Sequence, residues 1–302
     1  MTLEPPLKGR IALVAGATRG AGRGIAVQLG AAGATVYCTG RTTRTHRSPL
    51  NRAETIEDTA ELVTAAGGVG IAVAVDHMDA AQVKALAERI GADHAGRLDI
   101  LVNDVWGGEK LIVFDEPFWR QPLSGGLQMF RNAIETHLIT SWHVAPLLIA
   151  SGHGLVIEVT DGQEAGYRGS LFYDLSKATV IRLALGQAED LRPFGGTALS
   201  ITPGFLRSEE MLDHFGVTEA TWRAGAATDP HFAMAESPAY VGRAVAALAA
   251  DPDVARWSGQ ALSSWQMMHV YGFTDIDGSR PDWGRYYAEV AAGKTPDAGA
   301  FR

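Results

Sequence analysis

The sequence predicts an α/β fold with a doubly wound parallel sheet of about seven strands. Short apolar runs rich in β-branched residues alternate with longer helical patterns, as expected of parallel strands joined by crossover helices. A cluster of glycines follows the first of these runs, at residues 16–22. The 302 residues are 46% hydrophobic, which is sufficient for a sizeable core, and no change in composition indicates a second domain.

The elements are expected in regular alternation, followed by an extension. Strands are expected near 10–15, 35–39, 70–75, 99–103, 154–160, 197–202 and 260–264. Helices are expected near 22–32, 52–66, 80–94, 129–150, 173–191 and 238–250, with Asp79 as the N-cap of the third. Residues 1–264 thus form one domain, and 265–302 form a C-terminal extension.

Three segments lie outside this repeating unit. Residues 104–128 and 205–237 are long insertions, and 265–302 is a tail that carries several Trp, Tyr and Phe residues. All three follow the carboxyl ends of predicted strands, where open α/β sheets bind ligands. We expect the insertions to enclose a substrate. The tail either closes over an active site, its own or that of a neighbouring subunit, or packs on the scaffold away from the site.

Composition excludes several classes of function. The formal net charge of −8 argues against a nucleic-acid or anionic-membrane partner. The single cysteine, Cys38, lies inside a predicted strand and is expected to be a buried, inert thiol. No apolar run reaches the ~18 residues that span a bilayer, and no leader precedes the first strand, so a cytoplasmic location is expected. The histidines show no metal-ligand spacing.

The glycine cluster predicts a dinucleotide site of the Rossmann type. Gly16, Gly20 and Gly22 stand between an apolar strand and a helix, with Thr18 and Arg19 in the same turn. Glycines there let backbone amides approach a pyrophosphate at the helix N-terminus.

The end of the second predicted strand indicates which nicotinamide nucleotide is bound. An NAD site has a carboxylate there for the ribose 2′-hydroxyl. This strand instead ends at Arg41, which can donate to a 2′-phosphate, as can Arg19; Arg44 is a third possible donor. We therefore predict NADP(H), the alternative being that these arginines are solvated loop charges.

Tyr173 and Lys177 form the second motif. Their spacing of four places a phenol and an ammonium on one face of a predicted helix. A phenol titrates near pH ~10, and a nearby ammonium favours its ionised form. The pair can therefore serve as an acid and base.

Together, the glycine turn and the Tyr173–Lys177 pair resemble the short-chain dehydrogenase/reductase superfamily, from about Lys8 to Leu262. The long insertion and the tail are similar to a branch typified by the animal dehydrogenase/reductase family member one and its bacterial relatives. The resemblance implies that Tyr173 exchanges a proton with the substrate oxygen, and that Lys177 lowers the phenol pKa and binds the nicotinamide ribose. Asn132 matches the asparagine that holds a water of the proton relay.

The resemblance implies further cofactor contacts. Asp76 matches an aspartate at the adenine ring, and Asn103 is the surviving asparagine of a turn from which Asp104 and Trp106 depart. The run from Pro203 and Gly204 to Ser208 is similar to the family's cradle for the nicotinamide carboxamide.

The position of the family's catalytic serine is ambiguous. Aligned on the predicted strand it is Asp161, whereas counting back from Tyr173 makes it Thr160, which keeps a hydroxyl. An ionised Asp161 would oppose an oxygen that becomes anionic. We therefore favour Thr160 as the hydroxyl that binds the substrate oxygen, with Asp161 close enough to shape specificity.

These observations predict an NADPH-dependent oxidoreductase that interconverts a ketone or aldehyde and an alcohol. One alternative is a reductase of an imine or an activated C=C bond, and another is a catalytically weak, cofactor-binding regulator. By resemblance, the helices near 129–150 and 173–191 pair across a two-fold axis, so a homodimer or homotetramer is expected. Val180, Leu183 and Leu185 are the expected exposed apolar residues of the second helix.

Overall fold

Seven parallel strands form one sheet in the order β3-β2-β1-β4-β5-β6-β7. The computed structural model describes residues 4–163 and 166–302. The strands are β1 (Ile11–Ala15), β2 (Thr35–Gly40), β3 (Val69–Ala74), β4 (Ile100–Asn103), β5 (Leu155–Val159), β6 (Thr197–Thr202) and β7 (Ala261–Ser263). β1 pairs with both β2 and β4, so the winding direction reverses beside it, and sheets of this kind bind ligands at that point. The predicted fold class and all seven strands are confirmed.

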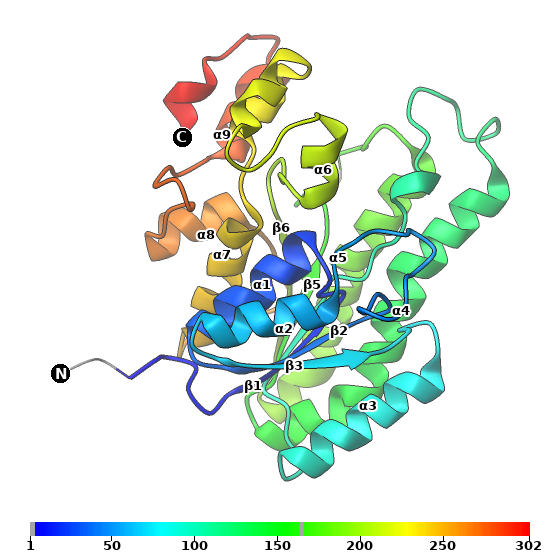
Figure 1. Cartoon of the computed structure of the whole chain (residues 1–302), viewed down its shortest axis with the longest axis vertical. Helices are drawn as coiled ribbons and strands as arrows, with labels where there is room; N and C mark the ends of the chain where they lie inside the picture. The colour runs from blue at the N-terminus through cyan, green and yellow to red at the C-terminus, as the bar shows by residue number, and fades with distance from the viewer. Residues whose placement is uncertain (1–3, 164–165) are drawn as a thin grey trace.

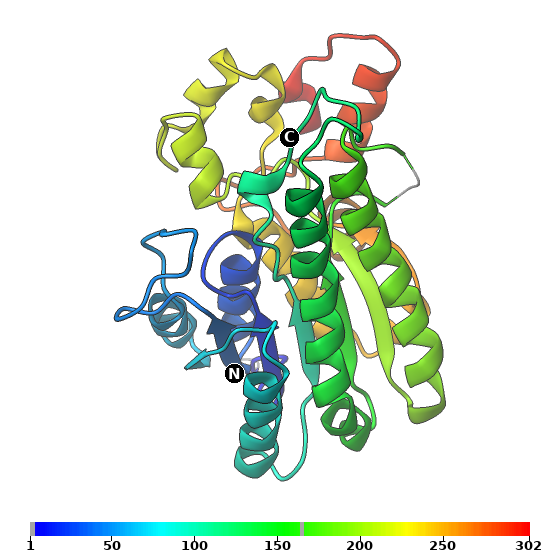
Figure 2. The same ribbon diagram turned by 90° about the vertical axis from the view of Figure 1, so that its right-hand side faces the viewer.

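Helices cover both faces of the sheet (Figure 1). The helices α1 (Gly20–Ala31), α2 (Ile56–Ala65) and α7 (Pro238–Ala250) lie on one face, and α3 (Ala80–Asp93), α4 (Leu123–Ser151) and α5 (Leu171–Leu191) lie on the other. Figure 2 shows α4 and α5 side by side along the molecule.

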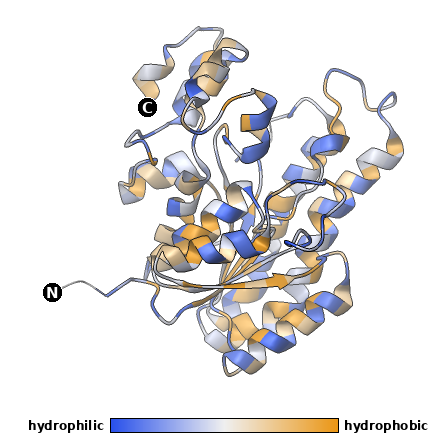
Figure 3. Ribbon diagram, viewed as in Figure 1, coloured by the Kyte–Doolittle hydropathy of each residue, from blue (hydrophilic) through white to orange (hydrophobic). Residues whose placement is uncertain are grey.

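The alternation of side chains along the strands produces two buried clusters. In β1, Val14 belongs to the cluster under α1 and α7, whereas Leu13 belongs to the cluster under α3, α4 and α5. Both side chains are fully buried, so the strand reads as a continuous apolar run. Figure 3 shows the apolar residues gathered along the sheet. Cys38 is buried in the first cluster, as predicted, and burial raises the pKa of its thiol to about 12.

Two helices begin several residues away from their predicted starts. The second helix begins at Ile56 rather than 52, because Thr55 caps it by accepting a hydrogen bond from Asp58 N. α4 begins at Leu123, six residues before the predicted start, so the insertion after β4 is shorter than expected. It contains a short 3₁₀ helix at Glu109–Leu111. Asp79 caps α3 as predicted, accepting from two amides of its first turn.

The second insertion and the tail pack against each other. The insertion contains α6 (Glu209–His214) and two 3₁₀ helices, Trp222–Ala227 and Pro230–Met234. The tail contains α8 (Ser264–Tyr271), α9 (Trp283–Ala291) and a 3₁₀ helix at Ala298–Phe301. α6 and α9 lie at the same end of the molecule (Figure 1).

Specific contacts join these two segments. Trp283 of α9 stacks on Phe205, with ring centres 5.9 Å apart and an interplanar angle of 14°. Arg207, fully buried, pairs with Asp275 at 3.2 Å. Met267 of α8 is part of the main core, so the first helix of the tail is not a separable lid. No helix within the described ranges combines the length and apolarity that a bilayer-spanning segment requires.

Candidate active site

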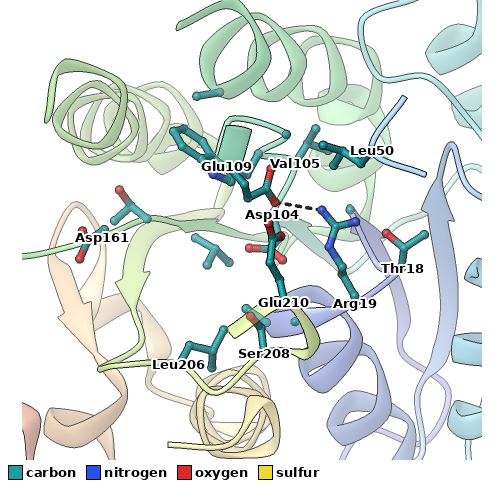
Figure 4. Close-up of a pocket in the computed structure, with 18 of the residues that line it drawn as sticks. Thr18, Arg19, Leu50, Asp104, Val105, Glu109, Asp161, Leu206, Ser208 and Glu210 are labelled. Carbon is teal, nitrogen blue, oxygen red and sulfur yellow. Dashed lines mark hydrogen bonds and ion pairs between the residues drawn. The ribbon is translucent and has the colours of Figure 1, made fainter. Parts of the chain in front are cut away.

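A cavity of about 750 Å³ lies at the carboxyl ends of β1, β4, β5 and β6. Twelve of the residues predicted to form the site line it: Gly16, Thr18, Arg19, Gly20, Arg41, Thr160, Asp161, Tyr173, Lys177, Pro203, Gly204 and Ser208. Figure 4 shows Asp161 toward one end, Thr18 and Arg19 toward the other, and Asp104 and Glu210 between them. The glycine turn and the Tyr173–Lys177 pair therefore share one cavity, although they are far apart in the sequence. None of the residues that line it comes from the tail, which instead supports the insertion that does.

The glycine turn requires glycines for close backbone packing. Gly16 has a φ of +91°, and a Cβ there would lie 2.6 Å from the carbonyl oxygen of Asp104. Gly22 does not line the cavity, but a Cβ on it would lie 2.3 Å from the carbonyl oxygen of Gly16. The turn and β4 can therefore approach only with glycine at these two positions.

The first turn of α1 already carries an anionic partner. The amide of Gly20 donates to Glu209 Oε2 of α6 at 2.7 Å, and Arg23 Nη1 lies 3.3 Å from Glu209 Oε1. A helix N-terminus attracts negative charge, and here a carboxylate from another segment meets that need. No local pattern indicates this contact, because its partners lie 189 positions apart.

Two of the three predicted arginines face the cavity. Arg19 Nη2 lies 2.9 Å from Glu109 Oε1 (Figure 4), and Arg41 Nη1 lies 3.8 Å from Asp76 Oδ2. Arg44 does not line the cavity, because its guanidinium hydrogen-bonds two carboxylates of α2, Asp58 and Glu61. The structure therefore does not bring Arg44 into the cavity with Arg19 and Arg41.

Tyr173 and Lys177 lie on one face of α5, as predicted. Lys177 Nζ lies 5.6 Å from the centre of the Tyr173 ring and 3.7 Å from the centre of the Trp106 ring. Trp106 and Phe114 both meet the tyrosine ring edge-on, with ring centres 5.6 and 5.9 Å away. Loss of hydration lowers the pKa of the Lys177 ammonium, and the negative charges of Asp161 and Asp104 oppose that shift.

Asp161, not Thr160, occupies the position beside the phenol. The Tyr173 hydroxyl donates to Asp161 Oδ2 at 2.7 Å. The Thr160 hydroxyl instead donates to the backbone carbonyl of Lys177 at 2.8 Å and so ties the end of β5 to α5. The preference for Thr160 is therefore corrected. Its hydroxyl is used within the fold, and the carboxylate of Asp161 is the group beside the phenol.

The same contact changes the expected acidity of the phenol. Burial raises the pKa of Tyr173 well above its usual value, and the charge of Asp161 and the hydrogen bond to it raise it further. The expected lowering by Lys177 is not what the structure shows. In this arrangement Tyr173 keeps its proton at neutral pH.

Three other predicted residues do not line the cavity. Asn132 donates to the carbonyl of Gly107 at 2.9 Å and accepts from Gln128, so it supports the insertion. Asn103 is fully buried and donates to Glu158 Oε1 at 2.9 Å. Asp76 caps a turn by accepting from Met78 N and approaches the site only through its ion pair with Arg41. Counting along the sequence could not reveal these orientations.

His137 of α4 lines the cavity where Asn132 does not. Its Nδ1 lies 2.6 Å from Glu158 Oε2, and its Nε2 lies 3.0 Å from the carbonyl oxygen of Val105. Since a carbonyl only accepts, Nε2 carries a hydrogen in this geometry. Glu158 also accepts from Gln187, which gives the buried carboxyl several partners. An acidic residue inside an apolar strand was the available signal, because a buried carboxyl requires partners.

Comparisons with known proteins agree with this geometry. The sequence profile of the short chain dehydrogenase family matches residues 10–216. The chain is 35% identical over 277 residues to mouse dehydrogenase/reductase SDR family member 1, covering 90% of this chain and 85% of that protein.

The chain belongs to the short-chain dehydrogenase family.

Other members extend the comparison. The human dehydrogenase/reductase SDR family member 1 is 32% identical over 91% of this chain and 86% of its own length. A short chain dehydrogenase from Mycobacterium thermoresistibile has the same fold, with a TM-score of 0.75 at 20% identity over 92% of each chain. A protein from Beutenbergia cavernae, described as an NAD(P)-dependent gluconate 5-dehydrogenase with NADP bound, has a TM-score of 0.67 at 24% identity over 86% of this chain and 97% of its own.

The cavity fits the NAD(P) nucleotide that this family binds. Gly16 and Gly20 lie at the start of α1, Arg41 lines the cavity beyond the end of β2, and Tyr173 and Lys177 line it from α5. A cavity of about 750 Å³ falls within the usual range for ligand sites. Within residues 4–163 and 166–302, no group of three or more His, Cys, Asp or Glu is arranged to hold a metal ion.

Asp104, which follows β4 and lies against the glycine turn, is a titratable group of this site. Burial raises the pKa of Asp104 to about 7, and Lys177 and the amide of Gly22 only partly oppose this. The unfolded carboxyl titrates near pH ~4. Because the folded protein holds this proton more tightly, the contribution to stability is complete below about pH 4 and is lost as the pH rises through about 7.

We expect Asp104 to make nucleotide binding depend on pH. Above its pKa an extra negative charge stands beside the glycine turn, where the nucleotide phosphates are expected, so the Kd for NADPH should rise roughly threefold to tenfold between about pH 6 and about pH 8. Asp104→Asn, which keeps the shape of the side chain, should give a flat profile. Fluorescence titration with NADPH measures both profiles, and a variant profile as steep as the wild type would refute the assignment.

Proposed function

We propose that this short-chain dehydrogenase uses NADP(H) to interconvert a ketone or aldehyde and an alcohol. The observation that carries the proposal is the meeting of Tyr173 and Lys177 with the glycine turn in one cavity. The nicotinamide supplies or accepts the hydride when it is bound. The protein's own residues then position the substrate, exclude water and move one proton.

Tyr173 is the proton donor in this proposal. Its phenol is protonated at neutral pH, because burial and Asp161 raise its pKa. To reach a substrate oxygen, the hydroxyl turns away from Asp161 Oδ2, to which it donates at 2.7 Å. Lys177, held over the Trp106 ring, supplies positive charge beside the developing oxyanion.

A substrate panel tests the activity. The loss of NADPH absorbance is followed with ketones, aldehydes, quinones and cyclic imines as acceptors. Turnover of ketones or aldehydes supports the proposal. NADPH binding without turnover of any compound would instead indicate a cofactor-binding regulator.

The choice of NADP(H) over NAD(H) rests on Arg41 and Arg19. Both guanidinium groups line the cavity, and no carboxylate ends β2. Arg41→Ala should raise the KM for NADPH by roughly tenfold or more, since it removes a charge-assisted contact, and should leave the KM for NADH nearly unchanged. Steady-state kinetics with each nucleotide measures this difference. Equal effects on the two nucleotides would overturn the assignment.

We also propose that the chain forms a homodimer or a homotetramer through α4 and α5. The expected contribution of Val180 is corrected, because it is buried within the protomer against Ala133 and Ile134. α4 exposes apolar side chains at Trp142 (74% exposed) and Leu138 (47% exposed), one helical turn apart, and α5 exposes Leu175.

Light scattering at micromolar concentration should give a mass of at least twice that of one chain. Trp142→Asp should lower this mass, because it places a charge on the proposed contact surface. A monomeric wild type would contradict the proposal.

A further inference from the structure

We propose that the active site selects substrates that carry a protonated nitrogen close to the reacting carbon, and that Asp161 is the residue that recognises it. The inference rests on the proposed function in one respect, namely that Tyr173 marks the position of the reacting group. It adds a chemical class of substrate, since a carbonyl reductase site by itself implies none.

The position of Asp161 places its charge close to the reacting group. It comes two residues after the end of β5, lines the cavity, and accepts from the Tyr173 hydroxyl at 2.7 Å. A substrate atom that receives a proton from this hydroxyl must come within a few Å of the carboxylate. Any charge next to that atom therefore interacts strongly with Asp161.

The sign of this charge suits a cation. A hydroxyl at this position could donate to a substrate oxygen, but an ionised carboxylate only accepts. For a neutral ketone, Asp161 opposes the negative charge that develops on oxygen. For a substrate with an adjacent ammonium or iminium nitrogen, the same carboxylate attracts the substrate and offsets the charge that it carries.

The walls around Asp161 suit the same ligand. Trp106, Phe114 and Phe205 line the cavity, and the first two pack edge-on against Tyr173. Aromatic rings attract cations through their negative faces. Lys177 already lies over Trp106, so the rings left for a ligand cation are Phe114 and Phe205. A carboxylate in an aromatic-lined cavity is thus a site for an organic cation.

The two neighbouring cations, Lys177 and Arg168, have partners other than Asp161. Lys177 is supported by the Trp106 ring, and Asp104 and Glu109 also favour its charged form. Arg168 hydrogen-bonds Asp174 of α5 at 3.0 Å. Asp161 therefore need not serve as the sole counter-ion of either cation.

Calorimetric titration tests the inference without turnover. Benzylammonium and benzyl alcohol, which differ mainly in charge, are titrated into the protein with and without saturating NADPH at neutral pH. We expect benzylammonium to bind the wild type at least roughly tenfold more tightly than the alcohol. Asp161→Asn, which keeps the shape of the side chain, should lose most of this preference.

Two further variants complete the design. Asp161→Ser should also lose the preference, which covers the case in which the Asn variant does not fold. Glu116→Gln removes one negative charge from an exposed position of the first insertion outside the cavity, and it should keep the preference. Equal binding of the two compounds by the wild type, or an unchanged preference in a folded Asp161 variant, overturns the inference.

A kinetic comparison relates the inference to the reaction. Ketones with an adjacent amine should have a higher kcat/KM than neutral ketones of the same shape, and Asp161→Ser should reverse that order. A cyclic iminium substrate separates recognition of the reacting nitrogen from recognition of an ammonium substituent. If no compound is turned over but benzylammonium binds as expected, the proposed function fails and the binding site stands.

Discussion

Replacing Tyr173 with Phe should lower kcat for carbonyl reduction by roughly 10²- to 10⁴-fold, the usual contribution of a positioned proton donor. The ring should keep its edge-on contacts with Trp106 and Phe114, because these do not involve the hydroxyl. The Kd for NADPH should therefore stay within about threefold of the wild type. Single-turnover kinetics and fluorescence titration measure the two quantities separately.

The Tyr173→Phe variant also removes the hydrogen bond to Asp161, which must be controlled for. Asp161→Asn keeps an acceptor beside the phenol, so it separates loss of the proton donor from loss of this contact. A Tyr173→Phe enzyme that reduces carbonyl compounds at nearly the wild-type rate would show that another group delivers the proton.

Replacing Lys177 with Ala should damage both turnover and nucleotide binding. The ammonium is the cation that opposes the raised pKa of Asp104 and lies over the Trp106 ring. Without it, kcat should fall by roughly 10²-fold or more, and the Kd for NADPH should rise by roughly tenfold. Steady-state kinetics and NADPH titration measure these changes.

A pH profile distinguishes this electrostatic role from a purely structural one. The pKa of Asp104 should rise further in Lys177→Ala, so the pH dependence of NADPH binding should move to higher pH. Lys177→Arg, which keeps the charge, should restore the wild-type profile at least in part. An unchanged profile in Lys177→Ala would limit the lysine to packing.

The predicted residues that the structure does bring together follow from short-range pattern. Tyr173 and Lys177 are four residues apart, so the geometry of a single helix places them together. Gly16 and Gly20 belong to one turn between a strand and a helix. The seven strands are predicted from apolar runs that alternate with helical patterns, which is also a local property of the sequence.

The parts that were wrong or missed depend on tertiary contacts. Arg44 hydrogen-bonds Asp58 and Glu61 of α2, and only the folded chain places these carboxylates against it. Asn132 and His137 both lie on α4, and only the packing of this helix directs His137 into the cavity and Asn132 toward the carbonyl of Gly107. Thr160 and Asp161 are adjacent on a chain leaving a strand, and only the packing of α5 decides which one meets the phenol.

The contact between Glu209 and the amide of Gly20 has a consequence for anion selectivity. Glu209 is a tethered anion at the start of α1, so a phosphate that binds there must exchange with a carboxylate. A tethered group has a high effective concentration. Free inorganic phosphate therefore competes poorly for these amides, whereas a ligand held at several points along the cavity can displace the carboxylate. A ligand that replaces Glu209 at the start of α1 is therefore one that also contacts other parts of the cavity.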